Sequence, residues 1–309
     1  MQLSVLSYYL NLYILPIIVV FGVVGNLLSV YIFTRPALHR SCSIYFLAGS
    51  INGLIILLFG TFIQWLTQIF PVLYATSISL EYCRFRTFML YVLYNLAPYF
   101  TACITIDRFC SSSVHPKLRR LSSRARIAYI VIPIIIFITA LAYIHIVIRF
   151  NIRNFRCQAE AGFYQNFFPF FTTGYYFIAI FIVLIFGLGT SYNIRIQTQR
   201  IQPMISTVTN STTREKRRAR GDSQLLLMLF IHVVCYAFLA LPYHLSLIAA
   251  AIQPTLPMDK IFLFVYQISY ITLNLSQAIN FYVFTLTANL YRKELQNLIN
   301  RLKLLFLAP

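Results

Sequence analysis

The sequence predicts an all-α membrane protein, in which a seven-transmembrane helix bundle is followed by a short amphipathic eighth helix. Of the 309 residues, 59% are hydrophobic and only 10% are charged, which is more apolar surface than one soluble core can bury. The apolar residues fall into blocks of about twenty or more, long enough to cross roughly 30 Å of hydrocarbon as helices. Basic residues gather between alternate blocks, as membrane topology requires.

Seven apolar blocks can be counted along the chain. They cover residues 10–33, 42–66, 86–110, 127–148, 168–194, 225–252 and 261–287. The blocks are continuously apolar rather than alternating every second residue, which favours helices over a β-barrel. The first block is too long for the core of a signal peptide and follows no positive region, so we expect it to remain as the first span. The sequence shows no internal repeat, and we expect residues 1–309 to form one domain.

The distribution of Lys and Arg predicts the orientation. Of the 25 basic residues, 19 lie on the side of the carboxyl tail and six on the other side. The positive-inside tendency therefore predicts a cytoplasmic carboxyl terminus and an extracellular amino terminus, in a multi-pass protein of the plasma membrane. Topology and anionic membrane lipids explain the net charge of +18 better than nucleic acid does. The basic run 214–220 is typical of a solvated loop, with a docking signal as the alternative.

Polar residues inside the spans are the candidate functional residues, because an ionisable group at membrane depth costs several kcal/mol unless it is paired. They are Asn26 in the first span, Asp107 and Arg108 at the end of the third, Asp222 at the start of the sixth, and Asn274 and Asn280 in the seventh. His145 and His232 have no neighbours of the ligand type, so we interpret them as packed residues. No metal site is predicted.

Arg108 needs a counter-charge, and both Asp107 and Asp222 are available. A pair between Arg108 and Asp222 would tie the third span to the sixth and keep the cytoplasmic face closed. The alternative is an interfacial arginine that reaches the lipid headgroups. Pro242 removes a backbone hydrogen bond and should kink the sixth span, so that its cytoplasmic half can swing.

In order and spacing, several of these residues resemble the motifs of the rhodopsin-like (class A) G-protein-coupled receptors. They are Gly25-Asn26, Cys83, Asp107-Arg108-Phe109, Pro242 and Asn280. The resemblance implies a receptor for an extracellular ligand that activates a cytoplasmic heterotrimeric G protein, without enzymatic activity or a cofactor. Segments such as 186–188 and 193–195 look more loosely like invertebrate neuropeptide receptors of the FMRFamide-receptor type, which implies a peptide ligand.

Two further features follow from this arrangement. Cys83 and Cys157 are the two cysteines expected outside the hydrocarbon on the extracellular, oxidising face, so we expect them to form a disulfide. After the seventh span, apolar residues recur at 291, 295, 298, 299, 302, 305 and 306, which is a helical stripe. This eighth helix, over about 290–306, should lie along the inner membrane surface.

Departures from the family pattern occur in several spans. The segment after Asn280 lacks the usual proline and tyrosine, and Ala240 stands where an aromatic residue is expected. Asn52 lies near the place of the sodium-binding aspartate, although the register could instead give Ile51. A neutral group there would weaken cation binding.

The ligand class is constrained by absences within the spans. Leu90 stands where amine receptors carry an aspartate, and Asn274 where opsins carry the retinal-binding lysine, so neither a monoamine nor a Schiff base is expected. The candidate ligand-binding residues are Leu90, Tyr94, Arg156, Tyr243, Gln267 and Asn274.

The arginines of the expected extracellular loops would suit a peptide ligand with acidic or aromatic groups, although they could equally anchor to lipid headgroups. A chemosensory (odorant-type) receptor and a receptor that does not couple remain alternatives. A transporter or channel is less favoured because no polar pathway or inverted repeat is visible.

Overall fold

The computed structural model describes residues 2–35, 41–70, 79–122, 124–153, 156–201, 211–253, 256, 259–287 and 289–307. Its helices are α1 (Gln2–Phe33), α2 (Ser41–Ile55), the π-helix η2 (Ile56–Phe62), α3 (Ile63–Ile69), α5 (Leu80–Ser112), α6 (Pro116–Ser122), α7 (Ala125–Tyr143), α8 (His145–Arg149), α9 (Phe163–Ile201), α10 (Ser211–Ile252), α11 (Lys260–Ala278), α12 (Asn280–Thr287) and α13 (Asn289–Leu307). Strands β1 (Phe150–Arg153) and β2 (Arg156–Ala159) form an antiparallel hairpin.

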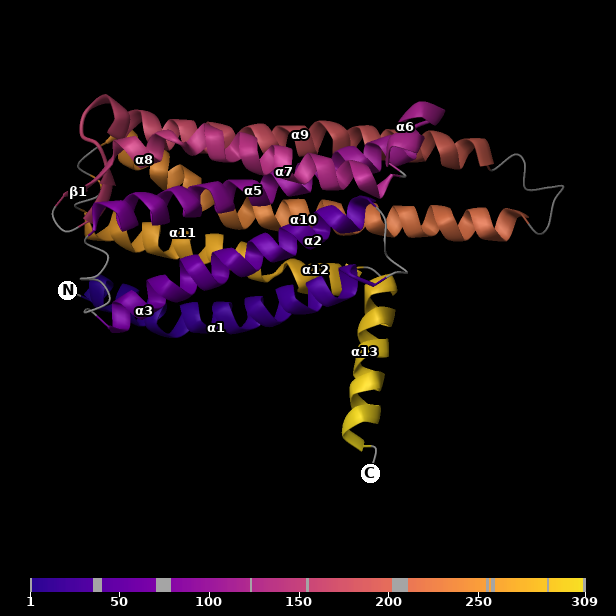
Figure 1. The fold of residues 1–309 in the computed structure, drawn as a ribbon, viewed down its shortest axis with the longest axis horizontal. Coiled ribbons are helices and arrows are strands. Elements are labelled where there is room, and N and C mark those ends of the chain that lie inside the picture. The colour runs from indigo at the N-terminus through magenta and orange to yellow at the C-terminus, as the bar shows by residue number, and fades with distance from the viewer. Residues whose placement is uncertain are drawn as a thin grey trace.

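The long helices lie side by side (Figure 1). In the part of the chain that the structure describes, they combine into seven rods, and this confirms the predicted fold class. Within the described residues, six segments are long and apolar enough to cross a membrane, namely Val5–Phe33, Ser41–Ile69, Leu80–Ser112, Ala125–Arg149, Phe163–Ile196 and Leu229–Ile252. The seventh rod is α11 with α12, which is more polar because it carries Gln267, Asn274 and Gln277.

The amino terminus and the β1–β2 hairpin lie at one end of the bundle, called here the hairpin end. At the opposite end, called the α13 end, α13 turns away from the rods and projects to one side of the bundle instead of continuing along it (Figure 1). Apolar and basic residues share α13, with Arg292 and Lys293 exposed in its first turns. This placement makes α13 the amphipathic eighth helix that the sequence predicts.

Helix α5 is the central rod, and it packs against α9, α2 and α7. Helix α10 packs mainly against α11 and α9, and α1 packs against α11 and α2. Large apolar side chains on the outside of the bundle stay exposed, among them Phe137, Ile148, Phe181 and Phe238. An apolar surface of this extent is unfavourable in water but suits contact with lipid chains, which are themselves apolar.

Candidate functional site

The α13 end of α5 holds a buried ion pair. The Arg108 guanidinium donates to Asp107 Oδ2 at 2.9 Å, and the two residues are only 8% and 7% exposed. Ser122 of α6 donates to Asp107 Oδ1 at 2.9 Å, so the carboxylate is held from two sides. Removing one partner of a buried ion pair leaves the other charge buried without compensation, which destabilises the protein. The side chain of Asp222, the second acid available to Arg108, lies outside the described residues, although its backbone belongs to α10.

Asn26 joins α1 to the seventh rod. Its side-chain amide donates to Gly22 O at 2.8 Å and to Gln277 O at 3.1 Å, and it is 1% exposed. Gln277 lies in the last turn of α11, directly before the break at Ile279. The seventh rod is divided at Ile279 although it lacks the proline expected after Asn280.

Asn52 holds α2 against α5, because its amide donates to Leu93 O at 3.0 Å. The residue of α2 that faces Asn26 is Gly53, where an added Cβ would lie 2.9 Å from Asn26 Oδ1. The position facing Asn26 therefore offers no oxygen ligand for a cation. Among the described residues, no group of three or more His, Cys, Asp or Glu could hold a metal ion.

A cavity opens in the hairpin half of the bundle, between α5, α9, α10 and α11. Its volume is about 90 Å³, well below the roughly 300 Å³ or more of a typical small-molecule pocket. Three of the predicted ligand-binding residues, Leu90, Tyr94 and Tyr243, line it. The other lining residues are Tyr91, Asn95, Thr172, Tyr176, Tyr236, His244, Tyr270 and Leu273. A small-molecule ligand of ordinary size must therefore widen this cavity.

Asn274 is the polar hub beside the cavity. Its Oδ1 accepts from the Tyr94 hydroxyl at 2.7 Å and from the Thr61 hydroxyl at 2.5 Å, while its amide donates to Tyr270 O at 2.8 Å. The side chain is fully buried. Asn274 thus connects α5, η2 and α11 at one point.

The other predicted ligand-binding residues lie elsewhere. Gln267 donates to Asn11 Oδ1, and this hydrogen bond ties α11 to α1. The side chain of Arg156 lies outside the described residues, although its backbone begins β2. Of the predicted set, the structure therefore brings Leu90, Tyr94 and Tyr243 to the cavity wall and Asn274 to its edge.

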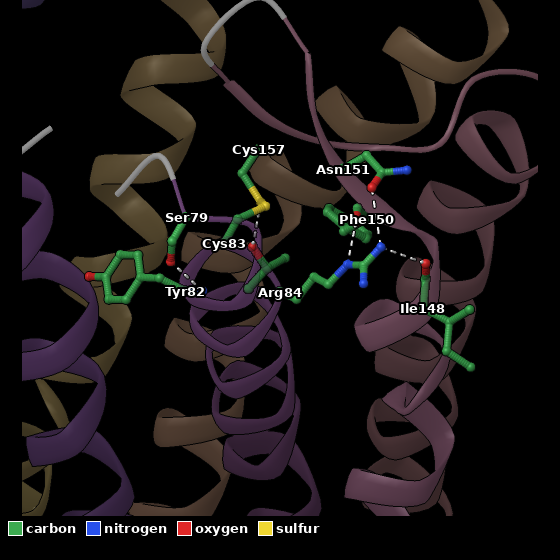
Figure 2. The surroundings of a disulfide bond; sticks show 9 residues. Ser79, Tyr82, Cys83, Arg84, Ile148, Phe150, Asn151 and Cys157 are labelled. Carbon is green, nitrogen blue, oxygen red and sulfur yellow. Dashed lines mark hydrogen bonds between the residues drawn. A yellow bond between two sulfur atoms is a disulfide. The ribbon is translucent and has the colours of Figure 1, made fainter. Parts of the chain in front are cut away.

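A disulfide pins the hairpin over this half of the bundle. Cys83 of α5 is bonded to Cys157 of β2, which confirms the predicted pair (Figure 2). Next to it, Arg84 donates to Phe150 O at 2.9 Å and to Asn151 Oδ1 at 3.2 Å, so a second contact fixes the same hairpin to α5.

Sequence reasoning missed most of the aromatic wall. His244 stacks on Tyr176 with ring centroids 4.1 Å apart, and Tyr176 lies 6.3 Å from Tyr236. The count of hydrophobic residues includes tyrosine, so the apolar blocks do not single out these phenols as polar. A signal was present in the recurrence of tyrosine at helical spacing, as in Tyr266 and Tyr270.

Comparisons with known proteins agree with this geometry. Residues 25–282 match the family model described as 7 transmembrane receptor (rhodopsin family). The crystal structure of squid rhodopsin is similar with a TM-score of 0.79 at 14% sequence identity, over 96% of this chain and 86% of that chain. A comparison with curated protein sequences found no match.

Proposed function

This chain belongs to the rhodopsin family of seven-transmembrane receptors, and we propose that it binds an extracellular peptide and activates a cytoplasmic heterotrimeric G protein. The observation that carries the proposal is the buried Asp107–Arg108 pair at the α13 end of the central helix. An ion pair buried away from water contributes little net stability. The presence of such a pair at this position therefore favours a role in switching rather than in stability. The proposed function is binding and signalling rather than catalysis.

The proposed switch lies between α5 and α10. Helix α10 contains Pro242 and continues past the α13 end of the bundle (Figure 1). Because proline removes one ladder hydrogen bond, the half of α10 before Pro242 can swing as a lever. Asp222 lies on that half, 20 residues before Pro242, and in the inactive state it would share the Arg108 guanidinium with Asp107. Ligand binding would then favour the state in which α10 has moved outward.

The test is guanine-nucleotide exchange by a purified G-protein heterotrimer with the receptor in lipid nanodiscs. We expect Asp222→Ala to raise ligand-independent exchange severalfold, because the closed state loses its bond across α5 and α10. Glu215→Ala is the matched control, since it removes an acid two turns earlier on the same helix. Exchange that is unchanged or lower in correctly folded Asp222→Ala would remove this switch.

A peptide ligand is favoured by the hairpin end, which we propose faces the cell exterior. The disulfide holds a β-hairpin above the cavity, and backbone or side-chain amides of a peptide could pair along its rim. Screening a peptide library in the same exchange assay tests this part. Stimulation by small volatile compounds and by no peptide would favour a chemosensory receptor instead.

A receptor that binds but does not couple is the second candidate, because Phe281 replaces the proline expected after Asn280. The break at Ile279 is present nonetheless, so the geometry favours coupling. Ligand binding without nucleotide exchange for any heterotrimer would support the second candidate. Ion flux without exchange would favour a channel.

A further inference from the structure

Arg86 lies in the second turn of α5, one turn before Leu90, the first residue of that helix to line the cavity. One of its terminal nitrogens donates to Gly60 O across a long 3.4 Å, and Gly60 belongs to the π-helix η2. Its Nε is buried and has no hydrogen-bond partner among the described residues. A guanidinium offers five donors, and at least the buried Nε of Arg86 is left for a further acceptor.

The other arginines described at the hairpin end bind the hairpin and its neighbours, although Arg153 Nε, like Arg86 Nε, is buried without a hydrogen-bond partner among the described residues. Arg84 is bound to the carbonyl of Phe150, Arg149 pairs with Glu160 at 2.9 Å, and Arg153 donates to Ala159 O at 2.5 Å. These contacts hold the hairpin and its neighbours together. Among the arginines whose side chains are described at this end, Arg86 is the one that reaches into the bundle.

The location of Arg86 connects it to the cavity. Residues 86, 90 and 94 are spaced by four, so their side chains lie above one another on one face of α5. A Cβ added to Gly60 would lie 3.0 Å from Leu90 Cδ2 and 3.6 Å from the Tyr94 hydroxyl, which shows that this face packs directly on Gly60.

No acidic residue lines the cavity, and the seven acids of the chain stand at positions 81, 107, 160, 215, 222, 259 and 294. Arg86, one turn of α5 before the lining residue Leu90, is therefore the cation nearest to it along that helix. A ligand ammonium near Arg86 would find no counter-charge in the cavity wall. A carboxylate would instead gain charge-assisted hydrogen bonds from Arg86 and from phenol hydroxyls, while an aromatic group packs among Tyr91, Tyr176 and Tyr243.

We propose that Arg86 anchors an aromatic carboxylate: the ligand of this receptor presents an anionic group to Arg86 and an aromatic group to the tyrosines below it. The carboxylate could belong to a small acid or to the free carboxyl end or acidic side chain of a peptide. This inference rests on the proposed receptor function and names the ligand chemistry of the same site.

The test is the thermal unfolding midpoint of the purified receptor in lipid nanodiscs, measured with matched probes. The small probes are 3-(4-hydroxyphenyl)propanoate, its amide, and tyramine, each at about 10 mM because ligands of fragment size bind weakly. The peptide probes are Ala-Gly-Tyr-Phe with a free carboxyl end and the same peptide amidated. We expect an acid in at least one pair to raise the midpoint, and its amide and tyramine to leave it unchanged.

Variants then test whether Arg86 is the residue that binds the carboxylate. We expect Arg86→Gln to weaken binding of the stabilising acid by roughly ten- to a hundredfold, the range for hydrogen bonds to charged groups. Arg86→Lys should retain part of the affinity, because it keeps the charge but loses the planar fork. Arg149→Gln is the control, since it removes an exposed arginine of the same end that pairs with Glu160.

Each outcome decides the inference. Stabilisation by amides or tyramine equal to that by acids overturns it, and so does an acid effect that survives Arg86→Gln or a panel in which no acid raises the midpoint. Binding of the small acid alone supports the Arg86 anchor and contradicts the peptide ligand. Coupling is tested separately by ligand-independent exchange of the Asp222→Ala variant, so a failure of the proposed function is distinguishable.

Discussion

Asn274 shows how much depends on one side chain whose partners are far away in the sequence. It accepts hydrogen bonds from Tyr94 and Thr61, on two other rods of the bundle. Asn274→Ala would leave both hydroxyls buried without their acceptor, which costs about 1–3 kcal/mol. We therefore expect a lower thermal midpoint for Asn274→Ala in nanodiscs. In a Tyr94→Phe background, Asn274→Ala should lower the thermal midpoint by less than it does in the unmodified protein. Equal decreases in both backgrounds would show that the hydrogen bond from Tyr94 contributes nothing to stability.

Gly22 of α1 faces Leu57 of η2 and Ala278 of α11, with no room for a larger side chain. A Cβ there would lie 2.5 Å from Leu57 Cδ1 and 2.8 Å from the Cβ of Ala278. Small residues allow membrane helices to approach closely, so Gly22→Ala should destabilise the bundle by about 1–3 kcal/mol through overpacking. Gly174→Ala on α9 is the control, because nothing lies within 4 Å of its added Cβ. A midpoint that falls equally for both variants would contradict the packing argument.

Sequence reasoning reached some of these residues and not others, for a physical reason. The Cys83–Cys157 pair could be predicted because only two cysteines were expected on the oxidising side. Asn274 could be singled out as polar within a span, but its partners could not be named. Side-chain partners depend on the rotation of each helix about its axis, and hydropathy does not determine that rotation.

At the scale of the element, the seventh rod is broken without the residue that usually breaks it. The side-chain amide of Asn26 donates a hydrogen bond to the Gln277 carbonyl, and α11 ends at the next residue, Ala278. We expect Asn26→Ala to return this carbonyl to the ladder, so that backbone amides 279–283 exchange hydrogen more slowly. Hydrogen exchange with mass spectrometry measures this change directly.

Asn52→Ala is the matched control for that experiment, since Asn52 also donates to a backbone carbonyl but on α5. It should leave exchange at residues 279–283 unaltered. An unchanged exchange pattern in Asn26→Ala would show that another contact causes the break. From the sequence alone, the missing proline put this break in doubt, because a carbonyl captured by another helix leaves no mark in the local sequence.

At the scale of the whole molecule, the pattern of apolar blocks is sufficient for the fold class, because a helix must satisfy its backbone internally to cross lipid. The seventh rod was the hardest to recognise by composition, since it carries buried polar residues such as Asn274 and Gln277. The tyrosine-lined cavity could not be predicted in the same way, because it arises only where four rods meet.

Two independent features of the whole chain predict its orientation. The disulfide and the amino terminus lie at the hairpin end (Figure 1), and disulfides persist in oxidising compartments. The carboxyl-tail side carries 19 of the 25 basic residues, and such residues favour the cytoplasmic side. We therefore expect an epitope tag before Gln2 to bind antibody on intact cells. A tag after Pro309 should bind antibody only after permeabilisation, and a tagged cytosolic protein in the same cells controls for leakage. Labelling of the carboxyl-terminal tag on intact, unleaky cells would reverse the topology, and with it would place the Asp107–Arg108 pair on the side of the membrane that no G protein reaches.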